Sequence, residues 1–241
     1  MKKIIFSLLL VSSLQLSIAQ PDFMVTTGIG YNASFMNSKV FDSIVDYYNV
    51  SRPWLSKELN HLKYMHGFAW NGSATRGVFL IDLNFLGRST VLSSQGEQDG
   101  EMFQRDIKVQ NGSFGLGLGL NIIKLPPFTF GLGFDAEIGA IKFKKRMYPV
   151  NTIGKPDYED IHNILSSGGN VWIQCMLYAP IFDDEDNGLG IAIRPYYRFD
   201  FLPYNFESVD ENINAIPYPN TKNGNLNHFG VEVVLNVVFS E

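Results

Sequence analysis

Two acidic side chains, Asp135 and Glu137, lie close together in a run that reads FTFGLGFDAEIGAIK from Phe128 to Lys142. Alone, two neighbouring carboxyl groups resemble the acid and base of a hydrolase. Further charged residues fall on the polar face of other segments with the same alternating pattern, and these are Asp82, Arg88, Arg194, Arg198, Asp200 and Glu232. Since unpaired buried charge is costly, we expect these side chains to pair with one another. This favours a plug of salt bridges over the other interpretation, a proton or ion path.

Other residues with catalytic or metal-binding chemistry do not form a specific motif. The acidic run Asp183–Gly188 lacks the alternating ligand spacing and the distal glutamate of a calcium loop, so it predicts a solvated turn. The glycines at 115, 117 and 119 lie inside a predicted strand and are not followed by a helix, which argues against a nucleotide site. The four histidines are scattered, and Cys175 is the only cysteine. We therefore expect no cofactor, no metal ion, no disulfide and no enzyme activity.

The element that carries Asp135 and Glu137 has two different faces. Phenylalanine, leucine, alanine and isoleucine occupy one face of Phe128–Lys142, and glycine, threonine and the two acids occupy the other. Successive side chains of a strand point to opposite faces, so this alternation predicts a β-strand. Glycine is tolerated in strands where space is tight. The pattern is typical of a transmembrane β-barrel with lipid outside and a narrow polar lumen inside.

Eight segments share this pattern, and they predict an all-β fold: an antiparallel up-and-down transmembrane β-barrel of eight strands. They are Met24–Phe35, Tyr64–Trp70, Val78–Leu92, Ile107–Ile123, Phe128–Lys142, Asn170–Ile181, Leu189–Phe201 and Asn227–Phe239. The expected short turns are Asn71–Gly77, Lys124–Pro127 and Asp183–Gly188, and the expected long loops are Met36–Lys63, Ser93–Asp106, Lys144–Gly169 and Leu202–Leu226. If both termini are periplasmic, every long loop lies outside the cell, as in outer-membrane barrels.

The N-terminus reads as an export signal. Lys2 and Lys3 precede the apolar run Ile4–Leu16, and Ser17-Ile18-Ala19 has the form of a cleavage site. We expect cleavage of residues 1–19, which leaves 20–241 as one outer-membrane β-barrel domain. Without Lys2 and Lys3, the mature chain has 17 basic and 24 acidic residues and a formal net charge of −7. This balance argues against nucleic acid as a partner.

The first long loop contains an amphipathic pattern. Phe41, Ile44, Val45 and Tyr48 follow the spacing of one helix face, with Ser38 as the expected N-cap. A second short helix is predicted to begin near Pro53, with Trp54 and Leu55 close to its start. Two interpretations remain open: these residues form a docking surface for another protein, or they form a lid on the barrel mouth.

Aromatic residues are expected in two girdles at the membrane surfaces. The outer girdle is predicted to contain Tyr31, Phe35, Tyr197, Phe199 and Phe201, and the inner girdle Trp70, Phe128, Phe130 and Phe239.

The signal peptide, the glycine-rich strands and the closing segment HFGVEVVLNVVFSE resemble the eight-stranded bacterial outer-membrane barrel families (OmpA-, OmpX- and PorT-like). The resemblance implies an outer-membrane location and contact with outer-membrane lipid and lipopolysaccharide, and it carries over no catalytic residue. PorT-like members serve a secretion machine. We therefore expect a non-enzymatic barrel whose loops bind another envelope protein in a larger assembly for secretion or surface functions. The alternatives are a small channel or porin and an outer-membrane lipid-modifying enzyme.

Overall fold

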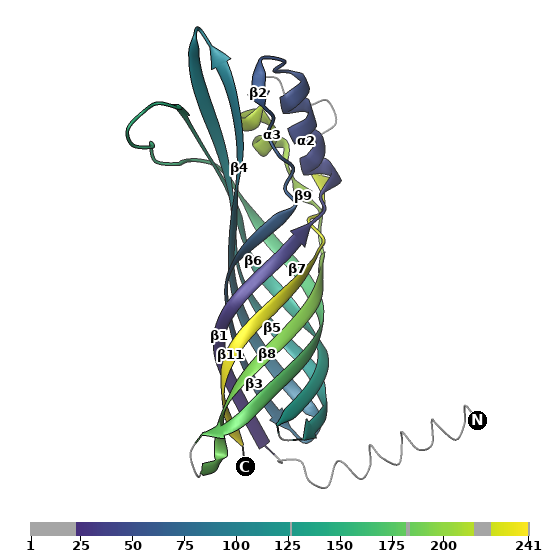
Figure 1. Ribbon diagram of the computed structural model, residues 1–241. Coiled ribbons are helices and arrows are strands. Elements are labelled where there is room, and N and C mark those ends of the chain that lie inside the picture. Colours follow the sequence, from purple (N-terminus) through teal and green to yellow (C-terminus); the bar gives the residue numbers. More distant parts are fainter. Residues whose placement is uncertain (1–22, 126, 182–183, 215–222, 241) are drawn as a thin grey trace, which may run out of the picture.

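The computed structural model describes residues 23–125, 127–181, 184–214 and 223–240, so the predicted signal peptide lies outside the described residues. Its long strands form a closed ring: β1 (Phe23–Met36), β3 (Tyr64–Arg76), β4 (Phe79–Gln98), β5 (Glu101–Leu125), β6 (Phe128–Pro149), β7 (Glu159–Ile181), β8 (Asp184–Asp200) and β11 (His228–Ser240). Each strand pairs antiparallel with its neighbours, and β1 closes the ring against β11 (Figure 1). The predicted eight-stranded antiparallel barrel is confirmed.

The short turns lie at the lower end of the barrel, where β1 begins and β11 ends. Met24 pairs with Ser240 there. The prediction that Asn71–Gly77 is a turn is wrong, because β3 continues to Arg76, which pairs with Phe79. The polar residues of this stretch resemble a turn in the sequence, but Asn71, Ser73 and Thr75 are buried. Small polar side chains at alternate positions suit a narrow lumen as well as they suit a turn. The predicted turn Asp183–Gly188 is too long, since β8 begins at Asp184, which pairs with Ile181, and Asp183 lies outside the described residues.

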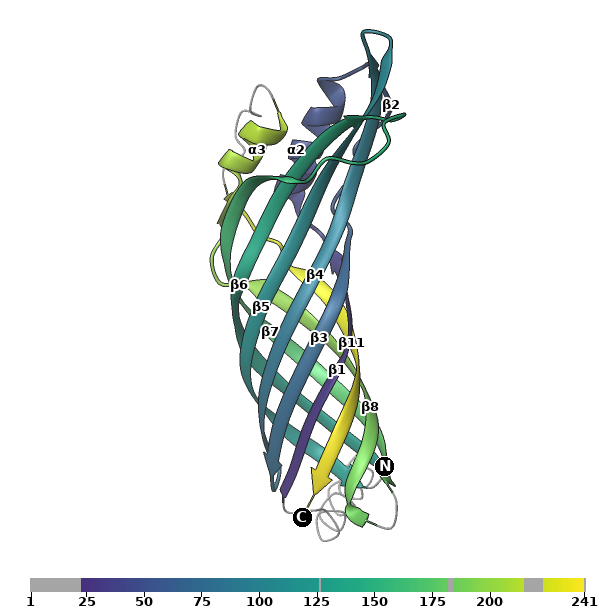
Figure 2. The ribbon, with the colours of Figure 1, turned by 90° about the vertical axis from the view of Figure 1, so that its left-hand side faces the viewer.

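At the upper end, β4, β5, β6 and β7, the longest strands of the ring, extend beyond the others (Figure 2). The prediction of a long loop over Ser93–Asp106 is wrong, because β4 and β5 remain paired up to Gln98 and Glu101. Asp99 and Gly100 close this hairpin with φ of 54° and 79°, the left-handed geometry that two-residue hairpin turns favour. The predicted loop Lys144–Gly169 is likewise too long, since β6 pairs with β7 up to Lys145 and Glu159.

The remaining long loops fold over the barrel mouth (Figure 1). The first contains α2 (Lys39–Val50), which begins where the Phe41 backbone N–H donates to Ser38 Oγ at 3.3 Å, as predicted. The second helix predicted near Pro53 is wrong, because that segment contains the short strand β2 (Leu55–Lys57) paired with β4. The loop after β8 contains β9 (Tyr204–Asn205), α3 (Glu207–Ile213) and β10 (Asn223–Gly224). Among the described residues, no helix has the length and hydropathy needed to cross a membrane.

The outward face of the lower barrel is apolar around its circumference. Large exposed side chains on it include Ile29, Phe79, Leu118, Leu177 and Leu235. The residues between them point inward and are mainly polar, as Asn84, Ser113 and Asn236 illustrate. A continuous apolar belt around a polar interior is the arrangement that lipid stabilises on a transmembrane barrel.

Candidate functional site

The centre of the lower lumen is organised around Arg194 on β8. Its Nη2 atom lies 2.7 Å from Asp82 Oδ2 and 3.0 Å from Asp135 Oδ2. The guanidinium carbon also lies 4.2 Å from the centre of the Trp172 ring, so the cation stacks on an aromatic face. All of these side chains are buried. One arginine therefore joins β4, β6 and β8 across the lumen.

A second group of charges lies directly above, around Glu137. The carboxylate Oε1 atom pairs with Arg198 Nη1, and it lies 3.6 Å from Arg88 Nη2. Asn170 Nδ2 bridges the two groups, because it donates to Glu137 Oε2 at 2.7 Å and to Asp135 Oδ1 at 2.5 Å. Asp135 and Glu137 thus pair with different arginines, and the barrel wall encloses both carboxylates.

The other two predicted members lie at the margins of this network. Asp200 Oδ1 lies 3.4 Å from Arg198 Nε, and its Oδ2 accepts a hydrogen bond of 2.6 Å from the Leu226 backbone N–H. Glu232 is buried and accepts a hydrogen bond of 3.1 Å from Asn71 Nδ2. The structure therefore places every residue of the predicted charge network inside the barrel. The asparagines were missed because an amide on an inward position has no distinctive signal in the sequence.

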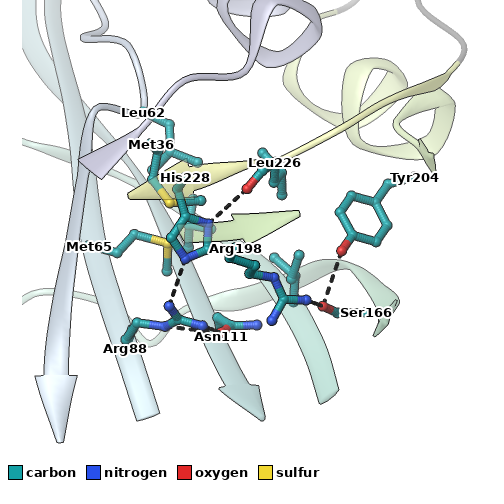
Figure 3. A pocket seen from close by; sticks show the side chains of 12 residues that line it. Met36, Leu62, Met65, Arg88, Asn111, Ser166, Arg198, Tyr204, Leu226 and His228 are labelled. Carbon is teal, nitrogen blue, oxygen red and sulfur yellow. Dashed lines mark hydrogen bonds between the residues drawn. The ribbon is translucent and has the colours of Figure 1, made fainter. Parts of the chain in front are cut away.

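The upper edge of the network contacts an apolar layer (Figure 3). Arg88 Nη1 donates to His228 Nε2, Ser34 Oγ and Tyr196 OH, each at 2.9 Å. With Arg88 and His228, a cavity of about 10 Å³ is lined by apolar side chains that include Met36, Leu62, Met65 and Leu226. The space between these side chains is therefore about that of one water molecule.

The apolar layer continues upward into a hydrophobic core between the strands and the cap. Phe41, Ile44 and Val45 of α2 are 0% exposed, and Tyr48 is 2% exposed. The Phe41 ring packs against Phe143 of β6, with ring centres 5.6 Å apart. The interpretation of these four α2 residues as a docking surface is wrong, because their side chains fill the barrel mouth. The lid interpretation fits their burial.

Trp54 and Leu55, predicted with that surface, occupy a different position. Trp54 is 44% exposed and lies against Gly96 of β4, where a Cβ atom would come within 2.5 Å of the ring. Both residues line a groove of about 210 Å³ at the upper end of the structure. Arg52 and Arg105 also line it, and both guanidinium groups stack on the Tyr48 ring.

The predicted girdle residues divide into two groups. Tyr31, Phe35 and Tyr197 are exposed near the upper end of the apolar belt, Phe201 is exposed just after β8, and Phe199 stacks against Phe134. Phe128 and Phe239 lie at the lower ends of β6 and β11, with Phe130 close by. The placement of Trp70 in the inner girdle is wrong. It pairs with Ile29 and Phe85 at mid-height, because β3 continues below it.

Together, these features define a closed eight-stranded β-barrel with an ion-paired lumen and a packed cap over its mouth. No group of three or more His, Cys, Asp or Glu side chains suited to a metal ion occurs in the described part of the chain. No family model and no curated protein matches the sequence.

Two bacterial surface proteins of known structure are similar in fold. The attachment invasion locus protein Ail of Yersinia pestis, in complex with the heparin analogue sucrose octasulfate, is 10% identical, with a TM-score of 0.40 over 89% of this chain and 99% of that chain. Neisserial surface protein A is 13% identical, with a TM-score of 0.35 over 91% of this chain and 97% of that chain. At this level of similarity, no functional residue is transferred to this chain.

Proposed function

We propose that this protein is a bacterial outer-membrane barrel that neither conducts nor catalyses, and that it acts through its extracellular surface as an interaction subunit of an envelope assembly. The observation that carries the proposal is a lumen occupied by its own ion pairs beneath a cap that is packed shut. Side chains buried in such pairs are not available to a solute. The chemistry that remains accessible lies above the membrane.

The accessible surface is the crest formed by the extended β4–β5 hairpin and the β6–β7 connection. Its exposed apolar side chains are Met102, Met147, Val150 and Ile153, and the exposed Trp54, from the loop before β2, lies against it at Gly96. Trp54 and Met147 line the same groove as Arg52 and Arg105. Tryptophan, methionine and arginine are enriched at protein interfaces, and the crest lies above the belt that lipid covers. A protein partner would bury these exposed groups.

Affinity purification from native membranes in mild detergent tests this proposal. Wild-type protein should emerge with a defined partner, and Trp54→Glu should lose it because a carboxylate cannot replace the ring in the groove. Val50→Glu is the matched control, since Val50 is exposed on the cap but does not line the groove. Wild-type protein that always emerges alone and monomeric would refute the proposal. Equal recovery of the partner with Trp54→Glu would refute the groove as its site.

The small-channel alternative gains no support from the lumen. A conducting path would have to pass the level of Arg88 and His228, where the cavity is about 10 Å³. The lipid-modifying alternative gains no support from Asp135 and Glu137, because both are buried against arginines.

A further inference from the structure

The outer wall of the barrel is hollowed where three small residues lie side by side. Gly87 of β4 pairs with Gly112 of β5, which pairs with Ala140 of β6. A Cβ atom at Gly87 or Gly112 would meet nothing within 4 Å, so both positions open outward. These three residues form part of the lining of a surface groove of about 570 Å³. The name wall groove is used for this feature below.

The two sides of the wall groove differ in chemistry. The row below its floor consists of Phe85, Phe114 and Ile138, which are exposed members of the apolar belt. The row above consists of Ser89, Gln110 and Lys142, all of which line the wall groove. Lys144 lines it one row higher. Apolar surface therefore changes to hydrogen-bond donors and positive charge across one row of small residues.

The height of this change matches a membrane surface. Ser89 lies on β4 about ten residues above Phe79, which marks the lower end of the strand. With a rise of about 3.4 Å per residue and a tilt of about 40°, the separation along the barrel axis is roughly 25 Å. That is about the height of the apolar band of an outer-membrane barrel. The lysines therefore lie at the level of outer-leaflet headgroups.

The charge of the wall groove is suited to an anion. Lys142 is exposed. Lys144 Nζ lies 3.0 Å from Asp160 Oδ1, and the Asp160 side chain is itself 79% exposed. An ion pair this exposed contributes little and is readily exchanged for another anion. On the neighbouring strands β1 and β3, rings lie near this level, and Tyr31 OH lies 3.2 Å from Tyr64 OH. The positive charge of the wall groove therefore comes from Lys142 and Lys144 of β6.

We propose that the wall groove binds the phosphorylated headgroup of an outer-leaflet lipid. The phosphate lies against Lys142 and Lys144, and Ser89 and Gln110 supply further hydrogen bonds. An acyl chain passes over Gly87, Gly112 and Ala140 onto the apolar row below. Continuity with the belt favours a lipid over a soluble anion. The inference rests on the proposed outer-membrane location, but it does not depend on a partner at the crest.

Native mass spectrometry of the full barrel in detergent tests this inference. The probes are bisphosphorylated lipid A, the same lipid without its phosphates, and inorganic phosphate as a competitor. Wild-type protein should retain the phosphorylated lipid preferentially, and free phosphate should not displace it because it lacks the acyl chains. The double variant Lys142→Gln/Lys144→Gln should bind the phosphorylated lipid about tenfold more weakly.

A second variant tests the shape of the wall groove without changing its charge. Gly112→Leu places a side chain in the open floor and should also weaken binding, whereas Ala136→Leu adds the same kind of side chain elsewhere on the exposed outer face and should not. Heat-modifiable gel migration verifies that each variant forms a barrel. Equal retention of the two lipids by wild-type protein, or wild-type binding by both the lysine and the glycine variants, would overturn the inference. The affinity purification is repeated with the lysine variant. If this variant still recovers the crest partner, the proposed function stands even where the lipid inference is overturned.

Discussion

The lower and upper parts of the lumen are built on the same strands but are stabilised by different interactions. On β6, the inward residues Asp135 and Glu137 form ion pairs, and the inward residues Ile141 and Phe143 above them join a hydrophobic core. The lower part is enclosed by the wall alone, so its charges can be satisfied only from other strands. The upper part is covered by α2 and α3, which bring apolar side chains of their own (Figure 2). The change from ion pairs to apolar packing thus marks the level at which the loops begin to fill the lumen.

The largest effect is expected from breaking the lower network. Glu137→Ala removes the carboxylate between Arg198 and Arg88 and leaves two buried guanidinium groups without it. Breaking a buried pair from one side typically lowers the free energy of unfolding by about 3–5 kcal/mol. Urea unfolding in lipid vesicles measures this loss. Asp160→Ala, which breaks an exposed pair, is the control and should cost at most about 1 kcal/mol. Equal losses in the two variants would contradict the difference between buried and exposed pairs.

A smaller and more local effect is expected in the upper core. Phe41→Ala removes the ring that packs on Phe143 and Phe206, and a cavity of this kind costs about 3 kcal/mol. This loss should release α2 while the barrel wall remains folded. Hydrogen exchange should therefore rise in residues 39–50, and heat-modifiable migration should persist. Val50→Ala at the exposed end of α2 should leave exchange unchanged. Global unfolding of Phe41→Ala would show that the cap and the wall form one cooperative unit.

The smallest effect is expected on the crest, where Asp106 holds β4, β5 and β6 together. Burial raises the pKa of Asp106, but hydrogen bonds from Gln104, Ser93 and Arg146 together outweigh it and lower the pKa below its ordinary value. The stability that ionised Asp106 gives to the folded crest is therefore fully present above the pKa of an unfolded aspartate, about 3.9. This stability is lost as the pH falls through the lower pKa of Asp106 in the folded protein.

Asp106→Asn should loosen the crest by about 1–2 kcal/mol at neutral pH, because it removes the charge from those hydrogen bonds. Protease sensitivity of the β4–β5 hairpin measures the difference between wild type and variant. The difference should stay constant from about pH 7 to pH 5 and disappear only in stronger acid. A difference that already disappears near pH 6 would contradict a lowered pKa.

The sequence predicts which residues face the lumen, because alternation is a local property of each strand. It identified Asp135, Arg194 and the other inward charges for that reason. It could not predict that Arg194 joins Asp82 and Asp135, because those contacts depend on how the strands are staggered around the ring. The sequence also could not show what the apolar face of α2 packs against. Phe41 and Tyr48 have the same spacing whether the helix covers a barrel mouth or binds another protein.

Strand boundaries are hardest to predict where neither face of a strand carries a series of large apolar residues. The sequence predicts a turn over Asn71–Gly77, but β3 continues to Arg76, and it predicts a loop over Ser93–Asp106, which forms the crest hairpin. In the first case the lumen requires small polar groups. In the second, the strands have left the apolar belt, so alternation no longer distinguishes their two faces.

Planar-bilayer recording is the most direct test of the central account, in which the lumen seals itself and function lies on the outer surface. Wild-type protein should give no stable conductance at any voltage. Phe41→Ala should also remain silent, because releasing the cap leaves the ion pairs of Arg194 and Glu137 in place below it. Reproducible single-channel steps from wild-type protein would contradict the account, since they would require a continuous path through the charged lumen.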